Sequence, residues 1–426
     1  MLKAAISRYG ARVLPNTEQI IAEHRRRGTL IQGPEIEAFE AAFAARAGVS
    51  AGHAVAASYG RMAFYYILKA LDLPPGSEIV VPALTFWVIP ELARVSGLKV
   101  VFADVDPATF TIDPDALEAV ITERTRAVVP THLYGLPCDM DRIMAIAARH
   151  NLVVIEDCAH ALGATYKGRP VGTFGEAGFF SFQTLKPLNC YGGGMALVRD
   201  AALADRVRAL AHAEPWPDEK RVTKRFFIGK LQRIFIRPWV FTISSFPILW
   251  LSSWFGANPD VYLWENIREL QPLPAQYIER FPNAQAAIGL EALKYLDAWT
   301  ARTQAHAAFV TARLRDLPGI TVPATPPDRT HVFYQYCVHG PEGPARDSLV
   351  VRCVRRGIDI ETLHVDVCTE MELFGDACKP APGAERAQQA MQVPVYSDLT
   401  DAQVRRVAGV VREVLSSAGS SGPATS

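Results

Sequence analysis

Short apolar runs rich in β-branched residues alternate with amphipathic stretches from about Val55 to Val198. This alternation is typical of βα units, in which parallel strands are buried between two layers of helices. The runs predict strands over residues 78–83, 99–105, 127–133, 152–157, 177–182 and 194–200, with helices over 61–71, 114–121 and 139–150. We therefore expect an α/β fold with a mostly parallel sheet, whose ligands bind at the carboxyl ends of the strands.

The pattern changes after about Leu293. One helix is predicted from Lys294 to Leu317 and an amphipathic one from Thr400 to Leu415, with strand-like segments between them. The sequence thus predicts a large domain over 1–293 and a small C-terminal α+β domain over 294–415. The large domain carries a hydrophobic insertion at about 214–279, and the small polar residues of 416–426 predict a disordered tail.

Charge and cysteine usage narrow the function. The 44 Lys and Arg residues balance the 44 Asp and Glu residues, and no long basic run with interleaved aromatic residues dominates the chain. A small molecule is therefore expected as the ligand, and nucleic acid is not. The seven cysteines form no CxxC pair or Cys/His cluster with metal spacing, so no metal site is predicted. The first residues lack the apolar core of a signal peptide, and we expect a cytoplasmic enzyme.

One lysine, Lys186, lies in the apolar and glycine-rich stretch SFQTLKPLNCYGGGM, residues 181–195. Burying an ammonium group is costly unless it is paired or loses its charge in a Schiff base. Pyridoxal phosphate chemistry requires such a lysine, together with an acid that keeps the pyridine nitrogen protonated. Asp157, at the end of a predicted strand, supplies an acid, although a lone acidic residue there is as often a helix cap. Ser181 and the start of the helix in SYGRMAF, residues 58–64, offer groups that bind phosphate.

The order of these motifs resembles the DegT/DnrJ/StrS family of sugar aminotransferases, which are pyridoxal-phosphate-dependent enzymes of fold type I. The most specific segment is IEDCAHALGATYKGRPVGTFGEAGFFSFQTLKPL at 155–188. Further segments that carry the resemblance are GPEIEAFEAAFA (33–44), PPGSEIVVPALTF (74–86), VFADVDPATFTIDPDALEAVI (101–121), THLYGLPCDMD (131–141), NAQAAIGLEAL (283–293), RDSLVVRCVRRGI (346–358) and VPVYSDLTDAQVRRV (393–407). The resemblance covers most of the chain.

The resemblance implies a role for each matching residue. Lys186 would form the Schiff base with pyridoxal 5'-phosphate and move the proton, and Asp157 would pair with the pyridine nitrogen. His160 would lie near the ring, while Phe86 would either stack on the ring or pack in the core. The residues expected at the phosphate are Ser181, Gly60 and Arg61. Because a dehydrating branch of the family replaces the lysine with histidine, retention of Lys186 favours transamination.

The resemblance also implies the partners. These are an amino donor, expected to be glutamate, a keto-sugar acceptor, and a second copy of the chain in a homodimer. Three departures bear on the substrate. The family's small-Gly-Thr phosphate loop reads Ser58-Tyr59-Gly60-Arg61, and its TGEGG segment reads Cys190-Tyr191-Gly192-Gly193-Gly194, without the glutamate. Its Asn-Tyr-Arg-Met segment aligns with residues 278–281, so Arg61 is expected to replace the asparagine with a charge.

The largest departure is an insertion of roughly fifty residues before Arg280. Residues 238–258 carry no charge and several tryptophans, and the stretch before them is rich in Lys and Arg. Pro247 and the serine pairs argue against a transmembrane helix. Basic residues followed by Trp and Phe suit a peripheral membrane contact through 225–258, at the inner face of the membrane, and a lipid-linked or membrane-delivered acceptor. The alternative is a buried helical hairpin or an oligomer contact.

Two other functions stay open. One is a catalytically silent regulator that binds pyridoxal phosphate, because family resemblance does not prove catalysis. The other is a membrane-interaction protein in which the fold serves only as a scaffold.

Overall fold

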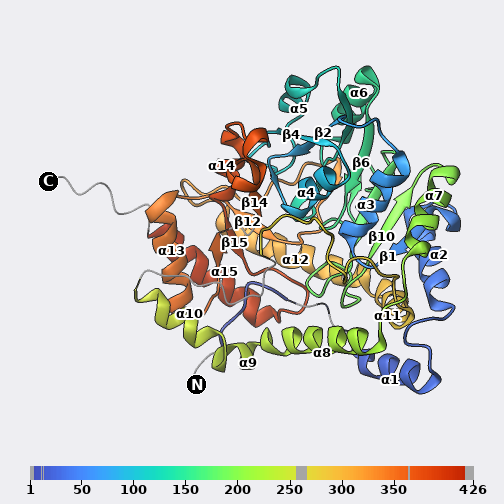
Figure 1. The fold of residues 1–426 in the computed structure, drawn as a ribbon. Helices are drawn as coiled ribbons and strands as arrows, with labels where there is room; N and C mark the ends of the chain where they lie inside the picture. The colour runs from blue at the N-terminus through green and yellow to red at the C-terminus, as the bar shows by residue number, and fades with distance from the viewer. Residues whose placement is uncertain (1–3, 11, 13, 256–265, 363–364, 418–426) are drawn as a thin grey trace.

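A seven-stranded mixed sheet forms the centre of the large domain (Figure 1). The computed structural model describes residues 4–10, 12, 14–255, 266–362 and 365–417. The sheet has the order β1-β10-β9-β6-β5-β2-β4. Its strands are β1 (Ala54–Ala57), β2 (Glu78–Pro82), β4 (Lys99–Ala103), β5 (Thr125–Val128), β6 (Val153–Asp157), β9 (Ala177–Ser181) and β10 (Gly194–Val198). Only β10 runs antiparallel to its neighbours in this sheet.

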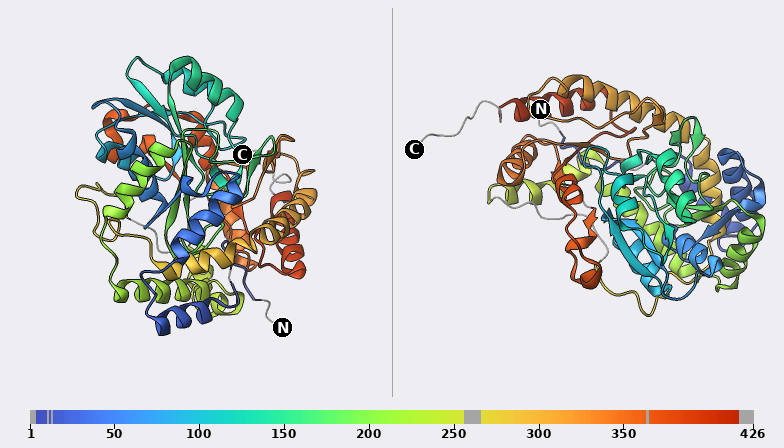
Figure 2. Two further views of the ribbon diagram at one scale, coloured as in Figure 1. Left: turned by 90° about the vertical axis from the view of Figure 1, so that its right-hand side faces the viewer. Right: turned by 90° about the horizontal axis from the view of Figure 1, so that it is seen from above.

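Helices cover both faces of this sheet, as Figures 1 and 2 show. Alternate residues of a strand point to opposite faces, and Ile79 and Val81 belong to one core whereas Val80 belongs to another. The first core includes residues of α3 (Gly60–Leu71), α4 (Val88–Val95) and α7 (Ala201–Ala213), and the second includes residues of α5 (Pro114–Val120) and α6 (Met140–His150). Burial on both faces explains why the strands read as unbroken apolar runs.

The predicted strands and helices are present with small shifts at their ends, and β1 was not predicted. The largest difference is the strand expected over 127–133, because β5 ends at Val128. Pro130 has no N–H group to donate to a ladder, so pairing beyond β5 is irregular. The backbone nevertheless stays beside its neighbours, with Val129 N donating to Val80 O at 2.8 Å and an isolated bridge between Thr131 and Asp157.

The small C-terminal domain has a core of its own. Its helices are α12 (Leu296–Leu314), α13 (Gly343–Arg355) and α15 (Asp401–Ser416), and its sheet consists of β12 (Tyr336–Val338), β15 (Met391–Val393) and β13 (Glu361–Thr362). Ile6, from the other end of the chain, is buried in this core and forms a bridge with Ile358. The N-terminal segment is thus tied to the small domain. Of the predicted tail, residues 418–426 lie outside the described residues.

The insertion forms α8 (Glu219–Phe235), α9 (Pro238–Ile243) and α10 (Phe246–Ser253). Figure 1 shows these helices along one edge of the molecule, next to α1 (Thr17–Arg27). Residues 256–265 of the predicted insertion lie outside the described part of the chain. No helix among the described residues is long and apolar enough to cross a membrane.

The remaining elements are shorter or peripheral. They are α2 (Glu35–Ala47), α11 (Asn283–Leu293), α14 (Pro382–Gln388), β3 (Leu84–Thr85), β7 (Thr165–Tyr166), β8 (Arg169–Pro170), β11 (Arg329–Thr330) and β14 (Asp366–Val367). The pairing of β14 with β3 joins a segment of the C-terminal part directly to the large domain.

Candidate active site

The predicted site residues gather at one edge of the central sheet. β1, β6 and β9 run in the same direction, so their carboxyl ends, at Ala57, Asp157 and Ser181, meet there. Lys186 lies in the turn that follows β9, and its backbone N–H donates to Gln183 O at 2.9 Å. The topology therefore brings a lysine, an aspartate and a helix N-terminus to one place.

The amine of Lys186 is held in a setting that disfavours its charge. Burial lowers its pKa to about 8, the Asp157 carboxylate opposes this shift, and the Arg61 guanidinium adds to it. Its Nζ atom lies 5.0 Å from the centre of the Tyr334 ring. A lowered pKa leaves more of the neutral amine near neutral pH, and the neutral amine is the nucleophile that attacks an aldehyde.

Asp157 is the last residue of β6 and is buried. Its Oδ1 accepts a hydrogen bond from Ala159 N at 3.0 Å, and its backbone N–H donates to Pro130 O at 2.9 Å. Burial raises the pKa of this carboxyl to about 6, against the lowering effects of the Ala159 hydrogen bond and the charge of Lys186. The acid is thus fixed in place at the end of β6.

His160 stands in a row of aromatic rings. Its ring centre is 4.2 Å from that of Tyr334 and 6.1 Å from that of Tyr134, and both pairs are stacked. Burial lowers the pKa of His160 well below its usual value, and the charge of Lys186 lowers it further. The Nδ1 atom faces Tyr134 N at 3.4 Å, so the neutral ring accepts there.

Gly60, Ser181 and Gly194 approach one another too closely for a side chain at position 60. A Cβ atom there would lie 2.7 Å from Phe180 O and 2.9 Å from the Ser181 Cβ. The register explains the approach, because Gly194 pairs with both Ala57 and Ser181. Gly60 also begins α3, where the first N–H groups have no acceptor within the helix. This cradle of N–H groups beside a serine hydroxyl suits a phosphate.

Arg61 follows Gly60 and is surrounded by aromatic rings. Its guanidinium carbon lies 4.9 Å from the Tyr277 ring centre, 5.3 Å from that of Phe86 and 5.5 Å from that of Tyr59, and it donates to the Tyr277 hydroxyl. Ser58 Oγ donates to Tyr277 O at 2.5 Å. Phe86 is half-buried, lies beside Arg61 and packs against the main core, so both of its expected roles stay open.

The segment that aligns with the family's Asn-Tyr-Arg-Met lies against the same cradle. Glu279 is buried and forms ion pairs with Arg221, at 2.8 Å, and Arg225, at 2.5 Å, of α8. Phe281 packs where Gly193 has no side chain, and Gly193 has φ +97°, a conformation that L side chains rarely adopt. The insertion is thus bonded to the segment beside the site.

Tyr191 lies in the glycine loop that follows Lys186. Its ring packs edge-on to Phe226 of α8 at 5.6 Å, and a Cβ atom at Gly229 of α8 would overlap this ring. The loop that follows Lys186 therefore rests on the first helix of the insertion.

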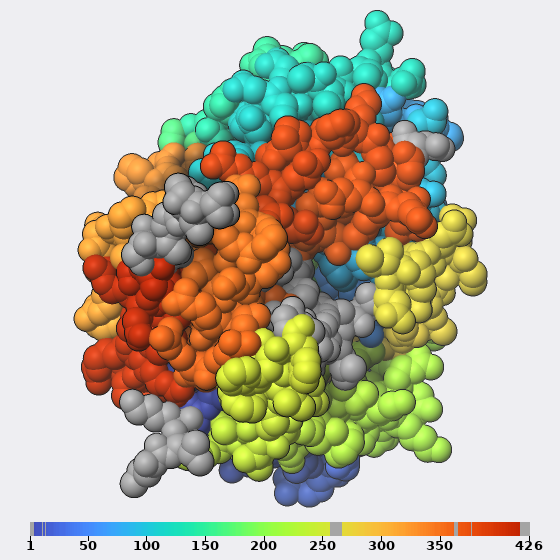
Figure 3. Space-filling model, turned by 90° about the vertical axis from the view of Figure 1, so that its left-hand side faces the viewer, coloured from blue at the N-terminus to red at the C-terminus, as the bar shows by residue number. Residues whose placement is uncertain are grey.

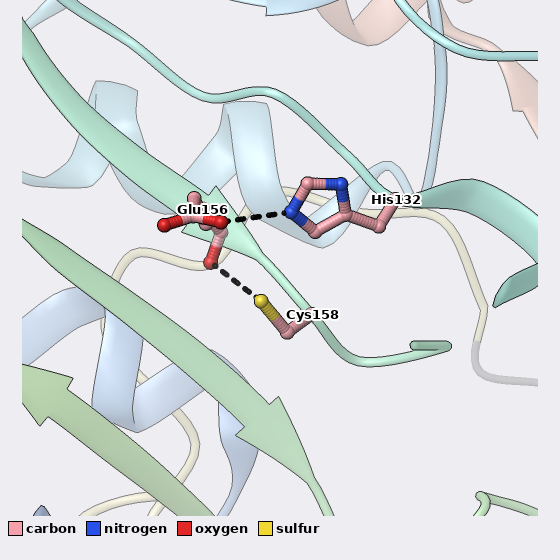
Figure 4. Close-up of side chains that lie close together, drawn as sticks. All are labelled: His132, Glu156 and Cys158. Carbon is pink, nitrogen blue, oxygen red and sulfur yellow. Dashed lines mark hydrogen bonds and ion pairs between the residues drawn. The ribbon is translucent and has the colours of Figure 1, made fainter. Parts of the chain in front are cut away.

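A buried cluster of side chains lies at the end of β6, where Glu156 and Cys158 flank Asp157 in the sequence (Figure 4). Among the described residues, His132, Glu156 and Cys158 lie close enough to share a metal ion, with ligand atoms within 4.8 Å of one another. However, both Glu156 oxygens already accept hydrogen bonds. His132 Nε2 lies 3.0 Å from Oε2, and backbone N–H groups of Gly172, Phe174 and Gly175 donate at 2.6–3.0 Å. The donor set therefore fits a hydrogen-bonded clamp that holds the end of β6 and the 172–175 loop.

The structure adds neighbours that were not predicted, namely Tyr334, Tyr277, Arg12 and His132. Arg12 Nη1 donates to Pro187 O at 2.9 Å, directly beside Lys186. Tyr334 is held because Val332 N donates to Gly135 O at 3.0 Å, which joins the two domains at the site. These residues come from distant parts of the chain, and only His132, at the end of a predicted strand, had a signal in the sequence.

The fold and this arrangement suit an enzyme that binds an aldehyde cofactor. A match to the model of the DegT/DnrJ/EryC1/StrS aminotransferase family covers residues 15–231 and 263–412. The chain therefore belongs to this family, and it is a pyridoxal-phosphate-dependent aminotransferase of fold type I. Residues 232–262, which include α9 and α10, fall between the two matched parts.

Individual relatives agree with the family. The chain is 33% identical over 419 residues to the dTDP-3-amino-3,4,6-trideoxy-alpha-D-glucose transaminase of Streptomyces venezuelae, with 97% of this chain and 94% of the relative covered. It is 31% identical over 406 residues to a pleiotropic regulatory protein of Geobacillus stearothermophilus, with 94% of each covered. The aminotransferase TlmJ from Streptoalloteichus hindustanus has a similar structure, with a TM-score of 0.77 and 26% identity over 97% of this chain and 99% of that one.

The residues present fit pyridoxal phosphate. The Lys186 amine, whose pKa is lowered, the buried acid and the close approach at Gly60 lie at one edge and match an aldehyde, a ring nitrogen and a phosphate, respectively. Arg61 adds a cation beside the phosphate cradle.

Proposed function

We propose that this chain transfers an amino group, taken from glutamate, to the ketone of a sugar. The observation that carries the proposal is that Lys186, in the turn after β9, and the buried Asp157, at the end of β6, lie at one sheet edge and influence each other's charge. The sugar acceptor is suggested by the Streptomyces venezuelae transaminase, whose name contains an amino sugar and which shares a third of its residues with this chain.

Each residue has a proposed task. When bound, pyridoxal phosphate stabilises the negative charge that develops on a carbon losing its proton. Lys186 Nζ holds the cofactor and then accepts and returns that proton. Asp157 keeps a proton on the ring nitrogen, and Ser181, with the N-terminus of α3 at Gly60, binds the phosphate. Arg61 supplies the positive charge at the phosphate. Phe86 and His160 lie against the cofactor ring.

The test is visible absorption of the purified protein with pyridoxal phosphate, before and after glutamate. A band that requires Lys186 is expected, so Lys186→Ala should lack it while Lys294→Ala, which changes an exposed lysine, keeps it. Glutamate should bleach the band and release one equivalent of 2-oxoglutarate. Absence of the band would refute the proposal.

A second candidate is a regulator that binds the cofactor without turnover, which the name of the Geobacillus stearothermophilus relative favours. In that case the band appears but glutamate leaves it unchanged, and other amino acids tried as donors do so as well.

We also propose that the enzyme is a homodimer working in the cytoplasm at the inner face of the membrane, on a lipid-linked sugar or another lipid headgroup. The apolar insertion at 225–258 motivates this part of the proposal. The measurement is amino transfer to keto sugars carried on a lipid and on a nucleotide. Transfer only to the nucleotide-linked sugar would contradict the proposal of a lipid-linked acceptor.

The homodimer is tested separately, by measuring the mass of the assembly with light scattering.

A further inference from the structure

Exposed apolar side chains are concentrated on the insertion. In the described part of the chain, ten of the twelve exposed large apolar side chains lie between Phe227 and Phe255. The most exposed are Phe255 at 82%, Ile243 at 77% and Trp239 at 66%. We define the apolar face as the outward side of α9, α10 and the two residues after them: Trp239, Ile243, Ile248, Leu251, Trp254 and Phe255. Contiguous patches of this kind mark interaction surfaces.

The inward side of the same two helices is firmly packed. Phe241 and Leu249 are each 1% exposed and pack with Ala5 and Val354. Ala5 N donates to Thr242 Oγ1 at 2.7 Å, and Arg355 Nη2 donates to Ser253 O at 2.8 Å. The helices are therefore fixed on the small domain, and their apolar face is turned outward by the fold.

Basic residues border the apolar face. Between Glu219 and Arg237 the chain has seven Lys and Arg residues against one acidic residue, although the whole chain has no net charge. Lys220, Lys224, Lys230 and Arg237 are exposed. Arg25 Nη2 reaches Thr223 Oγ1 at 3.4 Å, which places the basic end of α1 beside α8. We call this border, formed by α8 and the end of α1, the basic border.

The two features lie side by side. Figures 1 and 2 place α1, α8, α9 and α10 along one edge of the molecule, and Figure 3 shows the yellow-green atoms of α9 and α10 standing out on the surface beside the orange small domain. Cations next to exposed tryptophans are the arrangement that an interfacial protein presents to anionic headgroups and the acyl boundary.

The helices are too short to cross a bilayer, because α9 has 6 residues and α10 has 8. Pro238 and Pro247 lie in the first turns of α9 and α10 and divide the segment into two short helices. A second copy of the chain is the other occupant that an apolar face can have, and the light-scattering measurement below tests it.

We propose that the apolar face and the basic border dock the protein on an anionic lipid bilayer. The docking rests on these contacts and charges alone, and it goes beyond the amination chemistry. It would also present the enzyme to an acceptor carried by the membrane.

The test uses the full-length holoenzyme and sedimentation with vesicles of phosphatidylcholine, with and without phosphatidylglycerol. Binding to the anionic vesicles is expected, with weaker binding to the neutral ones. It should fall when salt is raised to about 0.5 M, where surface charges are screened within a few ångströms. Absence of binding to anionic vesicles would overturn the proposal.

Two variants locate the binding. Trp239→Ser/Ile243→Ser/Trp254→Ser should weaken vesicle binding by about tenfold or more, since each side chain removes apolar area from the contact. Lys220→Gln/Lys224→Gln/Lys230→Gln should remove the preference for anionic lipid. Tyr295→Ser, which changes an exposed aromatic residue outside the insertion, is the matched control and should bind as the parent does. The cofactor band and circular dichroism confirm that each variant is folded.

Two results would contradict the proposal. One is vesicle binding that both triple variants retain. The other is a smaller assembly, measured by light scattering, for the Trp239→Ser/Ile243→Ser/Trp254→Ser variant together with unchanged vesicle binding, which would make the apolar face a contact between copies of the chain.

Discussion

Lys186 shows how one residue can be prepared for its chemistry by its neighbours. Burial and Arg61 both disfavour the ammonium form, and Asp157 alone among the named groups favours it. The pKa of about 8 is a balance among these effects, so substituting either charged neighbour should shift the pKa of Lys186.

The pH dependence of cofactor capture by the apoenzyme should reveal this balance. Capture requires the neutral amine, so its rate should rise with pH through a midpoint near 8, well below the value of 10.5 for an ordinary lysine. Arg61→Met removes a cation and should raise the midpoint by about half a unit or more, and Asp157→Asn removes an anion and should lower it similarly. Stopped-flow absorbance measures the rate. A midpoint that is the same in all three proteins would refute this account.

Among single residues, the sequence predicted those whose reactive side chains lie at or just after the end of a strand. Lys186, Asp157 and Ser181 follow or end apolar runs, so their meeting at one edge could be predicted from the parallel sheet. Tyr334 could not be, because it reaches the site from the small domain through the contact of Val332 with Gly135. The charge network around Glu279 was missed for a similar reason, since its partners come from the insertion.

The start of α3 is the element on which the phosphate cradle depends. The helix begins beside β9 and β10. The φ of Gly60 is not positive, so the glycine is required by the close packing around it and not by its backbone conformation. The motif in the sequence indicated the helix start, but the contact with Phe180 and Ser181 depends on the order of the strands, which no local pattern reveals.

Gly60→Ala should therefore damage both folding and cofactor binding. We expect a loss of about 1–3 kcal/mol in the free energy of unfolding from overpacking. Pyridoxal phosphate binding should weaken by about tenfold or more, because the helix start must move away from Ser181. Urea unfolding of the apoenzyme and a cofactor titration measure the two effects. Gly52→Ala is the control, since nothing lies within 4 Å of its added methyl group, and its effect should stay within about 0.5 kcal/mol. Equal effects of both substitutions would contradict the packing argument.

Across the whole molecule, a buried ion pair joins the N-terminal segment to the small domain. Arg8 and Asp359 are each at most 1% exposed, and Arg8 Nη2 lies 2.7 Å from Asp359 Oδ1 while Arg8 Nε donates to the same oxygen at 3.0 Å. Glu361 also contacts Arg8. This connection was not predicted, because the N-terminal residues carry no pattern that assigns them to the small domain.

Arg8→Met should destabilise the protein strongly, because it removes a buried guanidinium that pairs with buried carboxylates. We expect a loss of about 3–5 kcal/mol in the free energy of unfolding, measured by urea denaturation near neutral pH. Breaking the exposed pair of Arg412 with Asp316 by Arg412→Met should cost about 1 kcal/mol or less. A small loss for Arg8→Met would mean that the N-terminal segment is held by its apolar contacts, such as that of Ile6.

The contact between Tyr191 and Gly229 has a consequence for descent. The ring of Tyr191 fills the space left by the missing side chain at Gly229, so neither position can vary freely while the other stays. A relative with a small residue at 191 can accept a side chain at 229, and one with the tyrosine must have the glycine. The two positions should therefore change as a pair.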